Sequence, residues 1–548
     1  MMPVTTEKRK EKEKQTTSRS WSSLARLRSV HWTVWLLLAV IVFFATVRFR
    51  LREMPLERDE GEYAYAGQLM LQGIPPYQLA YNMKLPGTYA AYAIILAVFG
   101  QTSAGIHTGL LLMNAATTLL VFVLGRKLFG TIPGAFCGMT YAMLSTSRTV
   151  LGLAGHATHF VVLAAVAGIL LLIYALESDR VALYFWSGTC LGLAFLMKQQ
   201  GIVFAMFAVA YLVYRKWEHR MDWRYAASRA GALLAGMAWP FGLTCLALYW
   251  AGVFSQFWFW TFTYARTYEI IHPFVMGMEA FGATAGLMLR LDWAIWVVVL
   301  CGLVALFWNR RSNDHYGLVG GLLAFSSLGV SAGLYFRGHY FVMLAPAAAL
   351  CAGFAVDHSI RFLQARQLGA AAVAIPAAVF AVALIISIAN ERTFFFAPDP
   401  VTANQRMYLG NAFPEAEEIA EYLKANTPPT ARLAIFGSEP EIYFSSQRRS
   451  VTGYIYTYAL MEDQKYATQM QQEMIKEVVR ARPEYVVFVD DGMSWLWQPG
   501  PSREAFFQWI RMFLTTDYEK VAQVDIAGSP PHLVEDASRI YVFQRRTH

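Results

Sequence analysis

The chain has little charge for its length. Only 15% of its 548 residues are Asp, Glu, Lys or Arg, whereas 56% are hydrophobic and the mean hydropathy is +0.35. Soluble domains contain about a quarter charged residues, so this composition excludes an ordinary soluble protein. Apolar runs recur through the first 390 residues, and each approaches the ~20 residues that a helix needs to cross a bilayer. The sequence therefore predicts a polytopic α-helical membrane protein.

Cysteine is also scarce. The five cysteines all lie in apolar runs, and none has the CxxC spacing of a metal or redox site. We therefore expect no disulfide framework, and the sequence predicts neither a metal nor a cofactor. The segment after the strand predicted at 432–437 lacks a GxGxxG phosphate loop, which argues against nucleotide binding. The net charge of +8 is spread over many loops, so we do not expect nucleic acid as a partner.

Three regions differ in composition. Residues 1–30 carry eight basic residues among glutamates, serines and threonines, which is typical of a disordered tail that stays in the cytoplasm. Residues 31–390 hold the apolar runs, and we interpret the first as an uncleaved span because no small-residue cleavage site follows it. Residues 391–548 begin with a proline-rich linker. Their strand-like runs at 432–437 and 485–489, separated by a long polar helix, predict a small α/β domain with a partly parallel sheet.

The charge of the connections decides which apolar stretches span. Twelve stretches can be counted: 31–49, 86–100, 104–124, 132–149, 156–176, 182–197, 200–214, 228–250, 290–308, 316–334, 339–356 and 369–389. If all of them crossed, the basic connection 215–229 would lie outside, against the tendency of Lys and Arg to stay in the cytoplasm. The stretch 86–100 is short and begins with Pro86-Gly87, so we interpret it as a helix at the outer interface. About eleven spans then place the basic connections inside, and 50–103 and 391–548 outside.

The first predicted outer loop concentrates ionisable side chains among aromatic ones. It has three carboxylates within four positions and then a lysine; its candidate residues are Arg58, Asp59, Glu60, Glu62, Tyr63 and Lys84. A carboxylate can accept a proton from a hydroxyl group, and a lysine beside it can hold an anionic group. A solvated loop would explain the charge, above all that of Glu62, but not its concentration.

Other predicted outer turns add candidates of the same kinds: His156, His159, Lys198, Arg337, His339 and Tyr340. For Lys198 the alternative is a helix-end lysine that extends to the interface. We interpret the aromatic run 257–260 as an interfacial belt and Arg266 as a surface residue. No nucleotide pool exists outside a cell, so a transferase there must take its sugar from a lipid phosphate. It needs a base for the acceptor, cations for the leaving phosphate and an apolar groove for the lipid.

These segments resemble the membrane glycosyltransferases with GT-C architecture. Asp59-Glu60-x-x-Tyr63 after the first span, followed by Lys84-x-Pro86, is similar to the first outer loop of the protein O-mannosyltransferases and the lipid A aminoarabinose transferases. Further similar segments are 125–130, 192–198 and 338–346. The resemblance covers roughly residues 50–360.

The resemblance implies an inverting transferase, for a hexose or a pentose, in the inner or plasma membrane. It would use a polyprenyl-phosphate sugar and act on a lipid, protein or polysaccharide acceptor at the extracytoplasmic face. Asp59 would be the base, with Glu60 as the second catalytic candidate. Lys84 would bind the donor phosphate, and we add Arg337, His339 and Tyr340 to that site. The remaining candidates for substrate binding are Arg58, Glu62, Tyr63, His156, His159 and Lys198.

Two departures from the family pattern stand out. Leu85 separates the loop lysine from the proline that usually follows it directly, and the second outer turn has His156 and His159 where relatives tend to carry an acidic residue. A histidine does not pair with a cation as a carboxylate does, so the residues give no support for a divalent metal.

Two other classes of protein remain open. A secondary transporter places polar groups and broken helices near the midplane of the membrane, whereas these spans are almost free of charge and a large outer domain follows them. A non-catalytic lipid-binding scaffold would tolerate replacement of Asp59.

Overall fold

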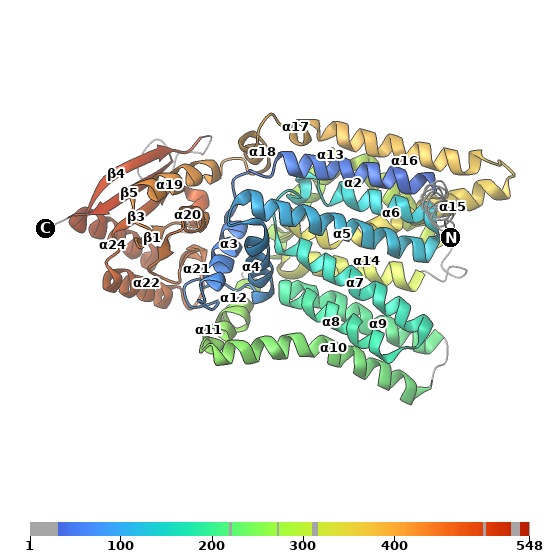
Figure 1. Cartoon of the computed structure of the whole chain (residues 1–548), viewed down its shortest axis with the longest axis horizontal. Coiled ribbons are helices and arrows are strands. Elements are labelled where there is room, and N and C mark those ends of the chain that lie inside the picture. Colours follow the sequence, from blue (N-terminus) through green and yellow to red (C-terminus); the bar gives the residue numbers. More distant parts are fainter. Residues whose placement is uncertain are drawn as a thin grey trace, which may run out of the picture.

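The computed structural model describes residues 31–218, 222–270, 273–308, 316–496, 500–527 and 538–546. The tail predicted at 1–30 lies outside these residues. A bundle of long helices occupies one side of the molecule and a mixed α/β domain the other (Figure 1).

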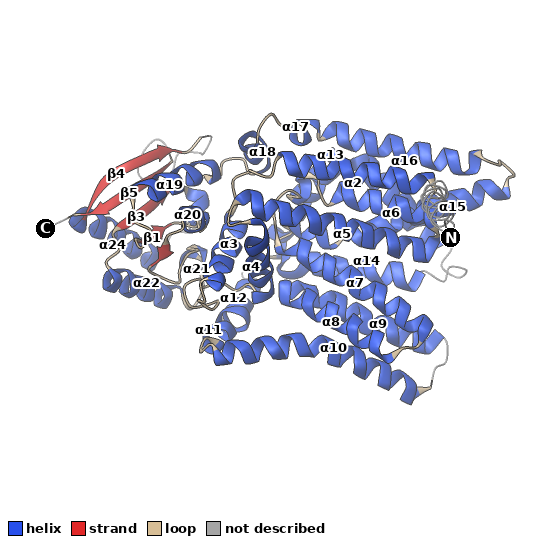
Figure 2. Ribbon diagram, in the orientation of Figure 1, coloured by secondary structure: helices blue, strands red, loops and turns tan. Residues whose placement is uncertain are grey.

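Long helices that run side by side form the bundle (Figure 2). They are α2 (Trp32–Arg50), α5 (Ser103–Phe129), α6 (Thr131–Leu144), α7 (Ala157–Ser178), α8 (Val181–Met197), α9 (Ile202–Glu218), α10 (Trp223–Trp250), α13 (Phe274–Trp308), α14 (Tyr316–Ser331), α15 (Ala345–Ala365) and α16 (Ala371–Asn390). Seven helices of the described chain are long and apolar enough to cross a membrane: α2, α5, α7, α10, α13, α14 with its 3-10 extension, and α16. The predicted polytopic helical fold is confirmed, and the count of about eleven spans stays a prediction.

Short elements connect these helices: η1 (Arg148–Val150), η2 (Gln199–Gly201), α11 (Phe254–Trp258), the π-helix η3 (Phe259–Tyr264), α12 (Ala265–Ile270), η4 (Ala332–Leu334), η5 (Gly338–Met343), α17 (Arg392–Phe395) and α18 (Pro400–Met407). The helices alternate in direction. The first loop, η1, η2, η4 and η5 therefore lie at the bundle end that faces the α/β domain (Figure 1). The basic last turns of α5 and α9 lie at the other end. The structure thus gathers the polar loops as the charge pattern predicts.

The apolar stretch 86–100 forms α4 (Pro86–Phe99), which lies with α3 (Arg58–Leu71) between the bundle and the domain (Figure 1). Proline in its first turn starts the helix, and Gly100 at φ +92° ends it in a conformation that glycine adopts without strain. Tyr89 and Tyr92 are buried, whereas Ile94 and Val98 are exposed. The position of α4 at the outer membrane interface stays a prediction.

The α/β domain contains a five-stranded sheet of order β2-β1-β3-β5-β4. Its strands are β1 (Arg432–Phe436), β2 (Arg449–Ser450), β3 (Tyr485–Asp490), β4 (Tyr518–Asp525) and β5 (Arg539–Arg545); its helices are α19 (Phe413–Asn426), α20 (Glu441–Ser446), α21 (Tyr458–Met461), α22 (Ala467–Ala481), α23 (Gly492–Trp495) and α24 (Pro501–Asp517). β1 is parallel to β3, as predicted, and also to β2, which was not predicted, whereas β5 pairs antiparallel with β3 and β4. We did not predict β4, whose sequence is polar and largely exposed.

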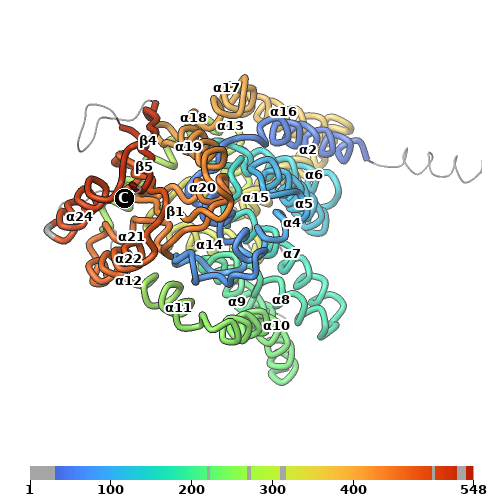
Figure 3. The backbone as a smooth tube through the Cα atoms, turned by 60° about the vertical axis from the view of Figure 1, so that its left-hand side comes forward, coloured from blue at the N-terminus to red at the C-terminus, as the bar shows by residue number. Residues whose placement is uncertain are grey.

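The domain packs directly on the first loop. Buried side chains of α3, α4 and η3 belong to the same hydrophobic core as those of the sheet. Tyr65 stacks on Tyr443, with ring centroids 5.2 Å apart, and its hydroxyl accepts a hydrogen bond from the Ser450 amide at 2.8 Å. At Gly61 a Cβ would lie 2.5 Å from the Glu441 nitrogen, so only glycine allows this approach. Figure 3 shows the domain, orange to red, against this end of the bundle.

Thiol labelling tests the orientation on which the outer-face assignment depends. Gln101→Cys and Leu409→Cys, both exposed at the domain end, should react with an impermeant reagent in intact cells, and Trp217→Cys at the other end of the bundle should not. Labelling of Trp217→Cys alone would place the domain in the cytoplasm. A cysteine-free parent chain removes the background from Cys301, which is exposed.

Candidate active site

The start of α3 is fixed by a capping box. The Glu57 carboxylate accepts a hydrogen bond from the Glu60 amide at 2.9 Å, and the Glu60 carboxylate accepts one from the Glu57 amide at 3.4 Å. Glu60 is fully buried and also accepts from the Gly155 amide at 2.6 Å and lies 3.0 Å from His107 Nε2. Glu60 therefore connects the first outer loop to the second outer turn, at Gly155, and to α5, at His107. Glu60 does not line the pocket described next, so its catalytic role stays a prediction.

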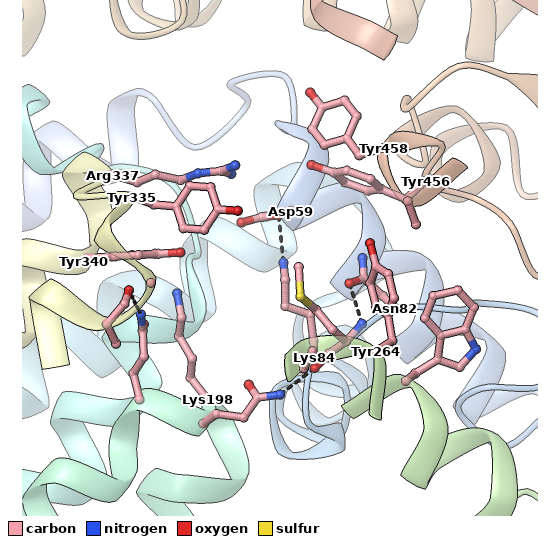
Figure 4. Close-up of a pocket in the computed structure, with 18 of the residues that line it drawn as sticks. Asp59, Asn82, Lys84, Lys198, Tyr264, Tyr335, Arg337, Tyr340, Tyr456 and Tyr458 are labelled. Atoms are coloured by element: carbon pink, nitrogen blue, oxygen red, sulfur yellow. Dashed lines mark hydrogen bonds and ion pairs between the residues drawn. The ribbon is translucent and has the colours of Figure 1, made fainter. Parts of the chain in front are cut away.

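A pocket with an empty volume of about 990 Å³, its mouth included, opens between the end of the bundle and the domain (Figure 4). Six of the predicted residues contribute to its wall: Asp59, Lys84, Lys198, Arg337, and the neighbours His339 and Tyr340 on η5. They come from the first loop, the end of α8 and the segment before α15. The fold therefore brings residues more than 250 positions apart in the sequence into one site.

Asp59 and Lys84 form an ion pair in the middle of the pocket. Lys84 Nζ lies 2.8 Å from Asp59 Oδ1, 3.5 Å from Glu62 Oε2 and 3.1 Å from the Tyr63 hydroxyl. Burial by itself would raise the pKa of Asp59, but the Lys84 ammonium and a hydrogen bond from His156 outweigh it and hold that pKa well below its ordinary value. Asp59 is therefore a carboxylate at neutral pH.

Glu62 and Tyr63 position Lys84 from behind. Glu62 is fully buried, accepts a hydrogen bond from Asn82 at 2.6 Å and another from the Tyr89 hydroxyl. Burial raises the pKa of Glu62 to about 7, although the nearby lysine opposes the shift. Neither Glu62 nor Tyr63 lines the pocket. They can orient the lysine but do not reach a substrate there.

Two further cations line one end of the pocket. Lys198 Nζ lies 4.0 Å from the centre of the Tyr340 ring, and the Arg337 guanidinium lies 5.6 Å from that of Tyr335. Burial, together with the charge of the neighbouring Lys84, lowers the pKa of Lys198 to about 7. Lys198 thus points into the site, and the alternative of a lysine at the membrane interface does not describe its surroundings.

The histidines lie behind Asp59. His156 stacks on His339 with ring centroids 4.0 Å apart, and its Nδ1 lies 3.8 Å from Asp59 Oδ2. Burial, together with the charge of His156 and of Lys198, holds the pKa of His339 well below its ordinary value. His159 is buried in α7 and does not line the pocket.

Asp59, His156 and His339 could hold a metal ion by type and proximity, because one ligand atom of each lies within 4.8 Å of the others. However, the Lys84 ammonium already lies 2.8 Å from the same carboxylate. A divalent ion would repel that ammonium. The donor set therefore fits a metal poorly, and we derive no catalytic step through one.

Arg58 belongs to the interface with the domain. Its guanidinium donates to Glu439 at 3.0 Å and to the side chain of Asn411, and the side chains of Arg58 and Glu439 are both buried. This ion pair fixes Arg58, the neighbour of Asp59 in the sequence, to the domain.

Sequence reasoning missed the aromatic part of the pocket. Trp260 lines it, although the run 257–260 was expected to lie at the membrane interface, and Tyr456, Tyr458 and Glu462 reach it from the domain. No motif marks these residues, and their role depends on the docking of the domain.

Comparisons with known proteins show which folds and sequences this chain is similar to. The family model of dolichyl-phosphate-mannose-protein mannosyltransferases matches residues 84–250. ArnT from Cupriavidus metallidurans, solved with undecaprenyl phosphate, is similar over 93% of this chain and 97% of its own, with a TM-score of 0.55 and 16% identity. AglB from Archaeoglobus fulgidus, an archaeal oligosaccharyltransferase solved with an inhibitory peptide and a dolichol-phosphate, is similar over 93% of this chain and 76% of its own, with a TM-score of 0.51 and 12% identity. The search of curated proteins gives no significant match.

The fold is therefore that of the GT-C membrane glycosyltransferases, and the resemblance inferred from the sequence motifs is confirmed. Within this class, the matched segment 84–250 is similar to the dolichyl-phosphate-mannose-protein mannosyltransferases. It includes Lys84, the second-turn histidines and Lys198, and it ends before Arg337.

Proposed function

We propose that this protein is a glycosyltransferase that moves a sugar from a polyprenyl phosphate to an acceptor hydroxyl. The observation that carries the proposal is the Asp59–Lys84 pair in a pocket that also contains Lys198 and Arg337. A carboxylate beside three cations provides both a proton acceptor and a binding site for a leaving phosphate. The lipid-linked donors named for the similar proteins, a polyprenyl or dolichyl phosphate, support the same class of substrate.

The reaction is a single displacement. The oxygen of the acceptor hydroxyl forms a bond to the anomeric carbon of the sugar while the bond from that carbon to the phosphate oxygen breaks. The electron pair of the broken bond leaves with the polyprenyl phosphate, and the hydroxyl proton passes to Asp59. Attack from the face opposite the phosphate inverts the anomeric configuration. A hexose or a pentose can undergo this step equally.

The ion pair links donor binding to the strength of the base. While Lys84 is paired with Asp59, the carboxylate is a weak proton acceptor, because the pKa of Asp59 lies well below its ordinary value. A donor phosphate attracts the same ammonium group. As Lys84 turns toward the phosphate, the pKa of Asp59 rises and its carboxylate becomes a better base.

Lys198 gives this site a specific pH dependence. Its pKa is lowered to about 7, so the ammonium form, which attracts phosphate, is lost as the pH rises above that value. We expect the affinity for undecaprenyl phosphate, whose own second ionisation is nearly complete above pH ~7, to fall by up to about tenfold per pH unit between pH ~7 and ~9. Lys198→Arg stays charged and should show a much weaker dependence. An equal slope in both proteins, measured by titration calorimetry, would remove Lys198 from the phosphate site.

Product analysis tests the proposed function itself. The purified protein is incubated with a panel of polyprenyl-phosphate sugars and a membrane extract, and the labelled product is identified by mass. Sugar transfer without uptake into proteoliposomes is expected. Uptake without transfer would favour the transporter, and neither activity would favour the scaffold.

A further inference from the structure

The pocket has two chemically different ends (Figure 4). Lys198 and Arg337, with Tyr335 and Tyr340, form a cationic end, which suits the donor phosphate. The opposite end is aromatic, and the Asp59–Lys84 pair lies between the two. An inverting displacement needs this order, because the acceptor must approach the sugar from the side opposite the phosphate.

Two separate parts of the chain build the aromatic end. Tyr81 and Trp260 stack with ring centroids 5.6 Å apart and an interplanar angle of 21°, and Tyr264 meets Trp260 edge-on at 5.2 Å. Tyr456 and Tyr458 of the domain line the same pocket, edge to face with each other at 4.7 Å. The hydroxyl end of Tyr456 points toward Asp59 (Figure 4). Rings from both parts of the chain therefore border the pocket next to the reacting groups, Tyr456 half-buried and Trp260 largely buried against Tyr81.

The backbone of the domain holds Tyr81 in place. The Tyr81 amide donates to the Gly453 carbonyl at 2.7 Å, and a Cβ at Gly453 would lie 2.3 Å from the Tyr81 ring. The aromatic wall thus depends on the docked domain, which gives the domain a direct function in the site.

The charge at this end argues against an acidic acceptor. Among the described residues that line the pocket, the lysines and the arginine belong to the cationic end or to the central pair, and Glu462 is the ionisable acid at the aromatic end. Its carboxyl accepts a hydrogen bond from the Tyr264 hydroxyl at 2.7 Å, and burial raises the pKa of Glu462 to about 7. A phosphate or carboxylate on the acceptor would meet this carboxyl group, and the cation within range of it, Arg337, already acts on that carboxyl group and lowers its pKa.

We infer that the aromatic end binds the acceptor and that the acceptor is a neutral carbohydrate. The C–H faces of a pyranose ring are apolar and flat, and they pack on the Tyr456 ring, with the largely buried Trp260 as part of the pocket wall. The sugar hydroxyls at the edge of the ring exchange hydrogen bonds with Glu462, which can accept or, when protonated, donate. One hydroxyl reaches Asp59 and becomes the nucleophile. This inference rests on the proposed transferase activity and names the class of acceptor for it.

Saturation-transfer difference NMR tests the inference without a known donor. The full-length protein in nanodiscs, with undecaprenyl phosphate present, is mixed in turn with neutral manno-, gluco- and galacto-trisaccharides and with a Ser/Thr-rich peptide. We expect saturation of the ring protons of at least one trisaccharide and none of the peptide. Tyr456→Ala and Trp260→Ala should weaken the binding by about threefold to tenfold each. Tyr456→Phe keeps the ring and should retain it.

Matched variants separate this inference from the proposed function. Lys198→Ala should lose affinity for undecaprenyl phosphate and keep saccharide binding, and Trp250→Ala, exposed on α10, should change neither. Three results would overturn the inference of a carbohydrate acceptor. They are saturation of the peptide alone, no saccharide binding by the folded wild type, and unchanged saccharide binding in Tyr456→Ala and Trp260→Ala. If Lys198→Ala and Arg337→Ala both bind undecaprenyl phosphate as the wild type does, the phosphate site is contradicted. This holds whether or not the saccharides bind.

Discussion

Replacement of Asp59 by asparagine is expected to lower turnover by roughly 10²–10⁴, the usual contribution of a general base, while the protein stays folded. The amide keeps the size of the side chain but neither accepts the proton of the acceptor nor pairs with Lys84, which lies 2.8 Å from Asp59 Oδ1. Steady-state kinetics with a polyprenyl-phosphate sugar would measure the loss as a decrease in kcat.

Two controls sharpen this test. Glu441→Gln changes a buried carboxyl group of the domain that does not line the pocket, and it should leave kcat nearly unchanged if the protein folds. Glu60→Gln alters the contacts to Gly155 and His107, so it should lower the thermal stability as well as the activity. Near-normal kcat in Asp59→Asn would exclude Asp59 as the base.

The second large effect is expected from Lys84→Ala. A charge-assisted contact to a phosphate contributes about 1.5–3 kcal/mol, so the KM for the donor should rise by about tenfold to 150-fold. The loss should exceed that of Arg337→Ala, because Lys84 lies beside the base and is oriented by Glu62 and Tyr63. Removing the ammonium also removes the interaction that lowers the pKa of Asp59.

The pH profile distinguishes the two roles of Lys84. In Lys84→Ala the residual activity should depend on a group with a higher pKa than in the wild type, since burial then raises the pKa of Asp59 without opposition from the lysine. The acidic limb of kcat should therefore move to higher pH. A changed KM with an unmoved acidic limb would mean that Lys84 binds the donor but does not control Asp59.

The fold gathers the predicted residues of the cationic end and the central pair into one pocket, and their roles stay predictions. The reason is physical: Lys and Arg in the connections decide which connections share a side of the membrane, and Asp59, Lys84, Lys198 and Arg337 all belong to connections between the long helices at one end of the bundle. Loops at one end of a bundle approach one another, so a common pocket was a reasonable expectation. The antiparallel strands β4 and β5 gave no clear alternation of polar and apolar residues and were not recognised.

The sequence could not separate residues that line the pocket from those that support it. Asp59, Glu60 and Glu62 are the same kind of side chain within four positions, yet one lines the pocket and two are fully buried behind it. The capping box at Glu57 and the direction in which each residue leaves α3 make the difference. The tyrosines of the domain were also missed, because contacts between distant segments form only after folding.

One measurement tests the central claim most directly. The purified wild type and Asp59→Asn are each given an isotope-labelled polyprenyl-phosphate sugar and a mixture of neutral oligosaccharides, and the released polyprenyl phosphate and the new glycoside are quantified together. The account predicts equal amounts of both products, an inverted anomeric bond in the glycoside, and a loss of both in the variant. Release of polyprenyl phosphate without a glycoside, or equal transfer by the two proteins, would contradict it.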